Sequence, residues 1–135
     1  MLRAFADTGY WIALLNPRDE LHQSAVRLSR DYAFADVLTS EVVLTEFLNA
    51  FSDYGSALRH AATAAVTSLK GSGAVIVPQS SALFAQALRL YEKMNDTSWS
   101  LTDCSSFVIM ETHHLSDALT HDRHFMQAGF QALLR

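Results

Sequence analysis

The sequence predicts an α/β protein with a short parallel sheet that helices cover on both faces. Short apolar runs alternate with longer segments of helical periodicity, and polar or glycine-containing turns separate the two. The short runs are apolar throughout, without the polar alternation of a half-exposed strand. Strands of this kind are typical of parallel sheets that are buried on both faces.

The predicted elements alternate along the whole chain. Strands are expected at residues 2–6, 37–39, 74–77, 116–120 and 130–134. Helices are expected at residues 10–15, 19–32, 41–53, 56–69, 80–95 and 103–114, with a polar loop or helical turn at 121–126. This alternation is the pattern of repeated strand–helix–strand units.

Local signals set the ends of the elements in the first half of the chain. Pro17 ends the first helix because proline has no N–H to continue the hydrogen bonding. Asp19 and Ser40 each have a side chain suited to cap the helix that follows. Gly55 breaks the third helix, and the turn at 71–73 (GSG) precedes the apolar strand that follows it.

Similar signals occur in the second half. Pro78 closes the third strand, and Ser80 or Ser81 caps the helix that follows. Thr102 is expected to cap the helix that starts at Asp103, and the spacing of Ser100 and Asp103 also fits a capping box. The helix at 80–95 is expected to turn one apolar side inward, made up of Leu83, Phe84, Ala87, Leu88 and Tyr91.

Composition sets limits on the class of protein. At 135 residues, of which 50% are hydrophobic, the chain is expected to form a single domain over residues 1–135. The formal net charge of −4 argues against a broad basic surface for nucleic acid but leaves room for a local acidic metal site. Cys104 is the only cysteine, which suits a reducing compartment such as the cytoplasm. Neither a signal peptide nor a membrane-spanning run is predicted.

Four acidic residues stand out: Asp7, Asp103 and Asp122 at or near the ends of predicted elements, and Glu46 inside the helix predicted at 41–53. In parallel sheets, ligands bind beyond the carboxyl ends of the strands. Asp7 directly follows a predicted strand, and Asp122 lies just after another. Each residue also has an ordinary interpretation, as a turn former, a solvent-facing helix residue or a helix cap. Together, the four carboxylates predict a catalytic site that binds Mg²⁺ or Mn²⁺, because these hard ions take oxygen ligands and activate water.

Three polar residues are expected to support the carboxylates. Thr8 follows Asp7 and offers a hydroxyl group. Asn49 lies one helical turn after Glu46, and Ser106 one turn after Asp103. The three are predicted as polar supports and not as metal ligands.

The acidic residues lie within segments that resemble PIN-domain ribonucleases, above all the VapC-like toxins of type II toxin–antitoxin pairs. These segments are Asp7–Thr8, residues 45–49 (TEFLN), 99–107 (WSLTDCSSF) and 120–125 (THDRHF). The run at 99–107 is the most specific of them. The resemblance covers nearly the whole chain, and the acidic positions of the family match Asp7, Glu46, Asp103 and Asp122.

The resemblance implies a three-layer α/β/α sandwich and metal-dependent cleavage of single-stranded or structured RNA. Its expected products carry a 5′-phosphate and a 3′-hydroxyl. It further implies two partners, a small antitoxin protein whose tail covers the cleft and a second copy of the chain in a homodimer.

Other functions stay open on the sequence alone. The same fold can serve as a non-catalytic module that binds RNA or protein, and related folds resemble nucleases that cut flap DNA. The histidines lack the ligand spacing of a zinc site, so His121 and His124 are assigned to the surface or to RNA contact. Trp11, Trp99, Tyr10 and Phe125 are expected in the core or an interface more than as base-stacking platforms.

Overall fold

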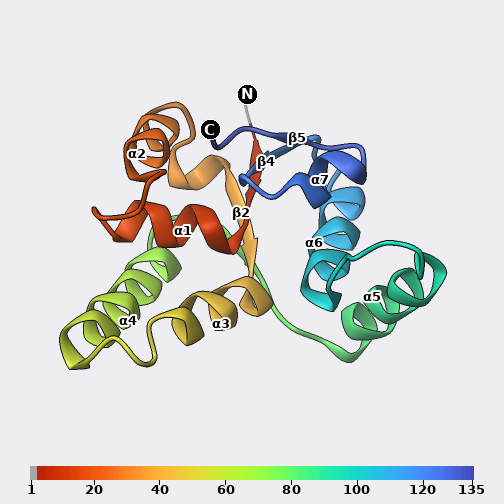
Figure 1. Ribbon diagram of the computed structural model, residues 1–135, viewed down its shortest axis with the longest axis horizontal. Coiled ribbons are helices and arrows are strands. Elements are labelled where there is room, and N and C mark those ends of the chain that lie inside the picture. The colour runs from red at the N-terminus through yellow and green to blue at the C-terminus, as the bar shows by residue number, and fades with distance from the viewer. Residues whose placement is uncertain (1–2) are drawn as a thin grey trace.

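A computed structural model describes residues 3–135 and contains one five-stranded parallel sheet (Figure 1). Its strands are β1 (Ala4–Ala6), β2 (Val37–Ser40), β3 (Val75–Val77), β4 (Asp117–Leu119) and β5 (Gln131–Ala132). Their order across the sheet is β3-β2-β1-β4-β5, and every neighbouring pair is parallel. The predicted strand at 2–6 begins at Leu2, which lies outside the described residues.

In the part of the chain that the structure describes, seven α-helices surround the sheet. They are α1 (Thr8–Leu15), α2 (His22–Asp31), α3 (Glu41–Ala50), α4 (Ser56–Lys70), α5 (Ser81–Lys93), α6 (Leu101–Thr112) and α7 (Arg123–Gln127), with a 3₁₀ turn η1 at Phe34–Asp36. In Figure 1, α1 to α4 gather on one side of the strands and α5 to α7 on the other. The predicted α/β class with a buried parallel sheet is confirmed.

The apolar strands explain this layering. All three residues of β1 are fully buried, as are Val37 and Leu38 of β2 and Leu119 of β4. A strand that buries both faces needs helices above and below it, and the long helical segments between strands supply them. The edge strand β3 is less covered, and its Val75 is 42% exposed.

The order in which strands are added to the sheet reverses at its middle. The chain runs outward from β1 through β2 to β3, then returns to the opposite side of β1 to form β4 and β5. The boundary between β1 and β4 is therefore the switch point, where open α/β sheets bind their ligands. Both strands end on the same edge, because they are parallel with Ala6 beside Leu119.

Of the two predicted caps of α6, the structure has the capping box of Ser100 and Asp103. The predicted Thr102 cap is wrong, because Ser100 is the N-cap residue. The Ser100 hydroxyl accepts a hydrogen bond from the Asp103 backbone N–H at 3.0 Å, and the Asp103 carboxylate accepts one from the Ser100 N–H at 3.0 Å. This reciprocal capping box satisfies two N–H groups that the helix leaves free, whereas Thr102 would satisfy at most one.

The predicted inward face of α5 is only half correct. Leu83 and Ala87 are buried, but Phe84, Leu88 and Tyr91 are each nearly half exposed. The contacts of α5 are concentrated on α6, so one stripe of its apolar side chains is covered and the adjacent stripe is left open. Helical periodicity alone does not distinguish a core face from a face that awaits a partner.

The aromatic residues follow the prediction. Tyr10, Trp11 and Phe125 are buried, and Trp99 is partly buried against Phe107. Cys104 is buried as well. Among residues 3–135, no helix combines the length and the apolar character needed to cross a membrane.

Candidate metal centre

Asp7 occupies the carboxyl end of the central strand. Its backbone N–H donates to the Leu119 carbonyl at 3.2 Å, which ties the end of β1 to the end of β4. The Thr120 hydroxyl donates to Asp7 Oδ2 at 3.1 Å and so fixes the buried carboxylate from the neighbouring strand end. Asp7 therefore lies at the switch point with a defined orientation.

The pKa of Asp7 is raised to about 6, mainly because the carboxyl group is buried. Hydrogen bonds from the Thr8 backbone and the Thr120 hydroxyl oppose the rise, and the charges of Asp103 and Glu46 add to it. Desolvation disfavours the charged form of a carboxyl group, and like charges nearby disfavour it again. The influence of Asp103 and Glu46 shows that α6 and α3 bring their carboxylates close to the end of β1.

Glu46 reaches this group from α3 without facing the core. The residue is exposed, with Thr45 and Asn49 beside it, so of the two orientations that the sequence left open the structure has the solvent-side one. The Thr8 hydroxyl donates to Glu46 Oε1 at 2.5 Å, which holds the carboxylate toward the start of α1. Thr8 thereby links the segment at Asp7 to α3.

A cleft of about 630 Å³ opens beside Glu46. Its lining includes Asn49 and Glu46 from α3, Gln79 from the segment after β3, and Thr102 from the first turn of α6. Asn49 therefore faces open space next to the acidic group, where a side-chain amide is accessible to a bound molecule.

Asp103 combines a structural and an electrostatic role. Its side chain closes the capping box of α6 and is mostly buried. Burial raises the pKa of Asp103, the Asp122 charge raises it further, and hydrogen bonding from Ser100 and the proximity of His124 lower it. Asp103 thus caps α6 and also lies close to other carboxylates, and its role as a metal ligand stays a prediction.

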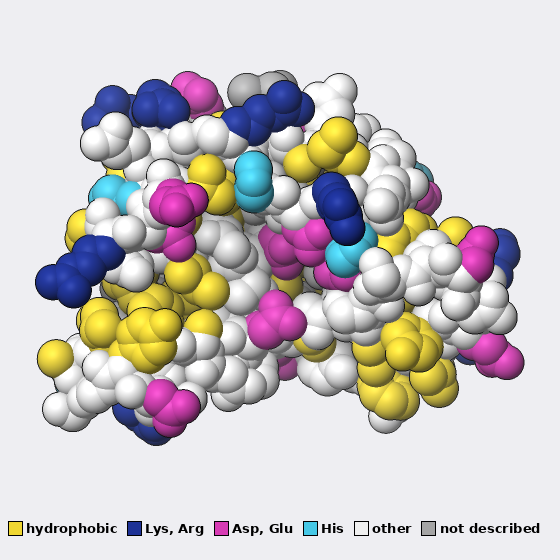
Figure 2. Space-filling model, in the orientation of Figure 1, with side chains coloured by type: hydrophobic (Ala, Val, Ile, Leu, Met, Phe, Trp, Pro, Cys, Tyr) yellow, Lys and Arg dark blue, Asp and Glu magenta, His cyan; other side chains and the backbone are white. Residues whose placement is uncertain are grey.

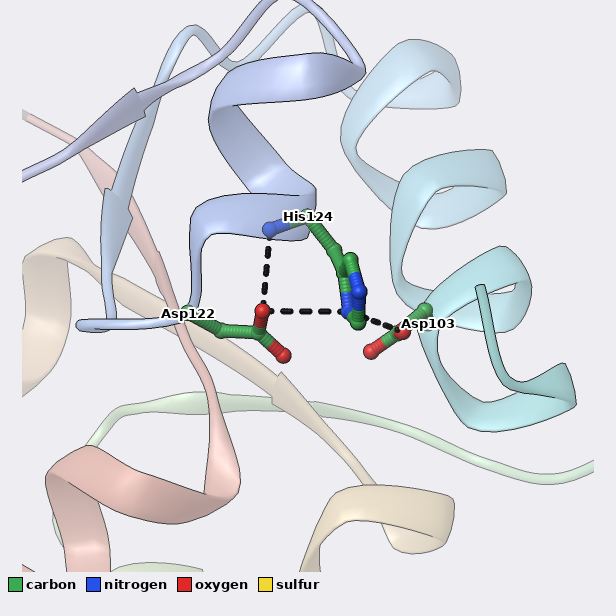
Figure 3. Close-up of side chains that lie close together, drawn as sticks. All are labelled: Asp103, Asp122 and His124. Atoms are coloured by element: carbon green, nitrogen blue, oxygen red, sulfur yellow. Dashed lines mark hydrogen bonds and ion pairs between the residues drawn. The ribbon is translucent and has the colours of Figure 1, made fainter. Parts of the chain in front are cut away.

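Asp122 and His124 complete the group from the start of α7 (Figure 3). Asp122 is the N-cap residue and accepts a hydrogen bond from the His124 N–H at 2.9 Å. The ring of His124 turns back over the helix end. Its Nδ1 lies 3.1 Å from Asp122 Oδ1 and 3.2 Å from Asp103 Oδ2.

His124 was missed as a site residue by the sequence prediction, which assigned it to the surface or to RNA contact. One signal was available. His124 follows Asp122 by two residues in the first turn after a strand end, where side chains turn toward the same edge of the sheet. The close spacing of His and Cys ligands is typical of zinc sites, and a ligand set composed mainly of carboxylates does not require it.

Ser106 lies one turn along α6 from Asp103 and is buried. Within residues 3–135, its hydroxyl has no hydrogen-bond partner. A buried hydroxyl without a partner costs free energy, and such groups are concentrated at functional sites. The prediction of Ser106 as a polar support stays a prediction.

The donors available here fit a divalent cation. One ligand atom each from Asp103, Asp122 and His124 lies within 4.8 Å of the others. In Figure 2, acidic side chains gather in the hollow at the middle of the face shown, with a histidine and a basic side chain at its rim. Burial is the main cause of the raised pKa of Asp7 and of Asp103, and the neighbouring carboxylates add to it. A bound cation would relieve both the desolvation and the repulsion.

The raised pKa of Asp7 makes the stability of the metal-free protein depend on pH. Its pKa is 3.8 when unperturbed and about 6 in the fold, so between these values the folded state binds more protons and the free energy of unfolding falls as pH rises. Asp7→Asn removes this effect. In urea unfolding with a chelator present, the variant should gain about 2 kcal/mol relative to wild type between pH 4 and pH 7. A difference between the two proteins that stays constant with pH would contradict the assignment.

Comparisons with known proteins agree with this architecture. The model of the PIN domain matches residues 4–131. The 23S rRNA-specific endonuclease VapC20 of Mycobacterium tuberculosis is 31% identical over 127 residues, which span 93% of this chain and 94% of that protein. The crystal structure of VapC20, described as a Sarcin-Ricin loop cleaving toxin, superimposes with a TM-score of 0.87 at 27% identity, covering 98% of this chain and 99% of the other.

A more distant solved structure shares the fold. FitAcB from Neisseria gonorrhoeae matches with a TM-score of 0.67 at 18% identity, over 98% of this chain and 96% of the other. The comparisons confirm the predicted fold class, the predicted kinship with VapC-like toxins and the prediction of an endoribonuclease. Nucleases of this kind generally use a divalent metal ion. The chain belongs to the PIN-domain family.

Proposed function

We propose that this protein is a Mg²⁺- or Mn²⁺-dependent endoribonuclease whose site is formed by Asp7, Glu46, Asp103 and Asp122. The observation that carries the proposal is the convergence of carboxylates from four separate segments on one edge of the sheet. Asp7 feels the charges of Glu46 and Asp103, and Asp103 feels the charge of Asp122. Partly buried carboxylates with raised pKa values and like-charged neighbours are concentrated at functional sites.

The side chains around the carboxylates supply orientation. Thr120 positions Asp7, Thr8 positions Glu46, and the capping box positions Asp103. We assign Asn49, beside the cleft, to contact with the substrate backbone, and Ser106 to support of the acidic group from below. When bound, a divalent ion supplies charge stabilisation for the phosphate and a more acidic water for attack at phosphorus.

The expected reaction is hydrolysis of an RNA phosphodiester with a 5′-phosphate on one product and a 3′-hydroxyl on the other. The similarity to VapC20 makes structured ribosomal RNA the first substrate class to test, ahead of unstructured single strands. The formal charge of −4 fits recognition of a folded RNA shape through a few contacts better than a broad basic surface.

Cleavage should depend on Asp103. We expect purified wild-type protein with Mn²⁺ to create new 5′-phosphate ends in ribosomal RNA, mapped by ligation and sequencing. Asp103→Asn should lower the rate at least about a hundredfold, because a lost carboxylate ligand removes several kcal/mol of transition-state stabilisation. Asp53→Asn, at an exposed acidic residue after α3, is the matched control and should cleave normally. Full activity in Asp103→Asn would refute the assignment.

The alternative function is a PIN-fold module that binds RNA or protein without cutting. It requires the acidic group to be inert, so Mn²⁺ titration separates the two proposals. An absence of Mn²⁺ binding at millimolar concentration, together with intact folding, would favour the binding module.

We further propose that the protein acts in the cytoplasm as the toxin of a toxin–antitoxin pair, as one domain over residues 1–135. An apolar groove of about 200 Å³ between α1, α3 and α4 supports the idea of an antitoxin partner, because apolar side chains line it and one of them, Phe34, is 47% exposed. A short amphipathic segment of an antitoxin fits such a groove, and its tail can then continue toward the acidic cleft.

Toxicity has a direct consequence in cells. Induced expression of the wild type should arrest growth, Asp103→Asn should not, and co-expression of the product of a neighbouring small gene should restore growth. Colony counts and growth curves measure this outcome. Normal growth with a protein that is proven active on RNA would exclude the toxin role.

The open stripe of α5 supports the proposed homodimer. Phe84, Leu88 and Tyr91 lie three or four residues apart, and each is nearly half exposed. Figure 2 shows a hydrophobic patch at the lower right, over the position of α5 in Figure 1. A helix face of this kind pairs readily with its own copy across a two-fold axis.

Leu88→Glu should therefore convert a dimer into a monomer in size-exclusion chromatography with light scattering, because a charge in a paired apolar face is costly. Tyr54→Glu, at an aromatic residue that is 61% exposed elsewhere, is the control and should leave the mass unchanged. A wild type that is monomeric at all concentrations would rule out this interface.

A further inference from the structure

The ring of His124 is held from both ends. Its Nε2 lies 3.0 Å from the Ser98 hydroxyl, in the loop before α6, and its Nδ1 lies over the carboxylates of Asp103 and Asp122. The side chain is 21% exposed. A histidine with one ring nitrogen fixed by a hydrogen bond and the other aimed at acidic groups has the arrangement of a metal-binding imidazole.

The Nδ1 atom itself lacks a hydrogen bond. It is buried, and among residues 3–135 no partner meets it with hydrogen-bond geometry, even though two carboxylate oxygens lie within 3.2 Å. When Nε2 carries the proton and donates it to Ser98, Nδ1 presents its lone pair to the same space as the carboxylate lone pairs. Lone pairs of three groups that face one another repel, and a cation bound between them would relieve that repulsion.

The spacing of these atoms matches a coordination shell. Two ligand atoms at right angles around an ion with bonds of about 2.1 Å lie about 3.0 Å apart. The separations of Nδ1 from Asp103 Oδ2 and Asp122 Oδ1 are 3.2 and 3.1 Å (Figure 3). Nδ1 therefore fits a position of the shell next to each carboxylate oxygen, and all three atoms lie within 4.8 Å of one another.

We propose that His124 Nδ1 is a ligand of the catalytic metal ion, beside Asp103 and Asp122, and that it shifts the preference of the site from Mg²⁺ toward Mn²⁺. This proposal rests on the metal dependence proposed above. Mg²⁺ prefers oxygen ligands and retains its waters, whereas transition ions accept imidazole nitrogen readily. Ser98 is then a positioning residue, since its hydroxyl fixes the ring through the opposite nitrogen.

The direct test is pulsed electron paramagnetic resonance of the Mn²⁺-loaded full chain. A coordinated imidazole nitrogen couples to the electron spin of Mn²⁺, and ¹⁵N labelling of histidine should change that coupling. The signal should be present in wild type, lost in His124→Gln, and retained in His60→Gln, which alters an exposed histidine on α4. The wild-type signal needs no substitution, so it is informative even if a variant folds poorly.

Calorimetry gives a second readout. His124→Gln should weaken Mn²⁺ binding about tenfold and Mg²⁺ binding much less, so that the ratio of the two affinities falls. Ser98→Ala should also lower the ratio of the Mn²⁺ affinity to the Mg²⁺ affinity, but by less than His124→Gln. His60→Gln should leave the ratio unchanged.

The outcomes distinguish the role of His124 from the acidic metal site itself. Mn²⁺ binding without histidine coupling, or with equal losses for both ions in His124→Gln, would overturn the role of His124 and leave the acidic metal site standing. No Mn²⁺ binding by wild type would overturn both. Histidine coupling that only His124→Gln abolishes, with a lowered Mn²⁺ preference, is the expected result.

Discussion

The rest of the structure is arranged around a carboxylate that is buried at the end of β1, with further carboxylates beside it. Asp7 is buried between strand ends, and the charges of Glu46 and Asp103 reach it across the edge of the sheet. In a partly desolvated place such charges interact strongly, so the metal-free state is electrostatically strained. Because a divalent cation relieves this strain, its binding at the site is favourable.

The rest of the fold holds this arrangement against its own repulsion. Apolar β1 and β4 fix the backbone of Asp7 and Thr120 in the most buried part of the molecule. Hydroxyl groups from Thr8 and Thr120 then fix individual carboxylates. The capping box does the same for Asp103, so the interaction that starts α6 also orients a residue of the candidate site.

Local chemistry was sufficient to predict the layers of the fold. The apolar runs predicted the five strands, and Ser40 and Ser80 cap the helices that they were expected to cap. The side of a helix that faces the core was harder to predict, because Phe84, Leu88 and Tyr91 have the same periodicity as core residues. Their exposure depends on which neighbours α5 has in space, and the sequence does not state that.

The candidate site, too, could be predicted where local signals exist and not where it depends on neighbours in space. The sequence drew attention to the acidic residues at element ends, but the hydrogen bond between Thr8 and Glu46 joins residues 38 positions apart and has no local signal. The proximity of His124 to the acidic residues could not be predicted from the sequence for a related reason. Its ring turns back over the start of α7 to meet Asp103 from another helix, and this proximity arises only when α6 and α7 pack together.

The central claim is that the acidic edge of the sheet is a metal-binding site, and thermal unfolding with increasing Mn²⁺ tests it most directly. An ion that binds only the folded state stabilises it by about 2.7 kcal/mol at a hundred times its dissociation constant. The account predicts a melting temperature that rises steadily with Mn²⁺ at neutral pH in wild type and stays flat in a variant that carries both Asp7→Asn and Asp103→Asn. A melting temperature that does not respond to Mn²⁺, or an equal rise in both proteins, would contradict it.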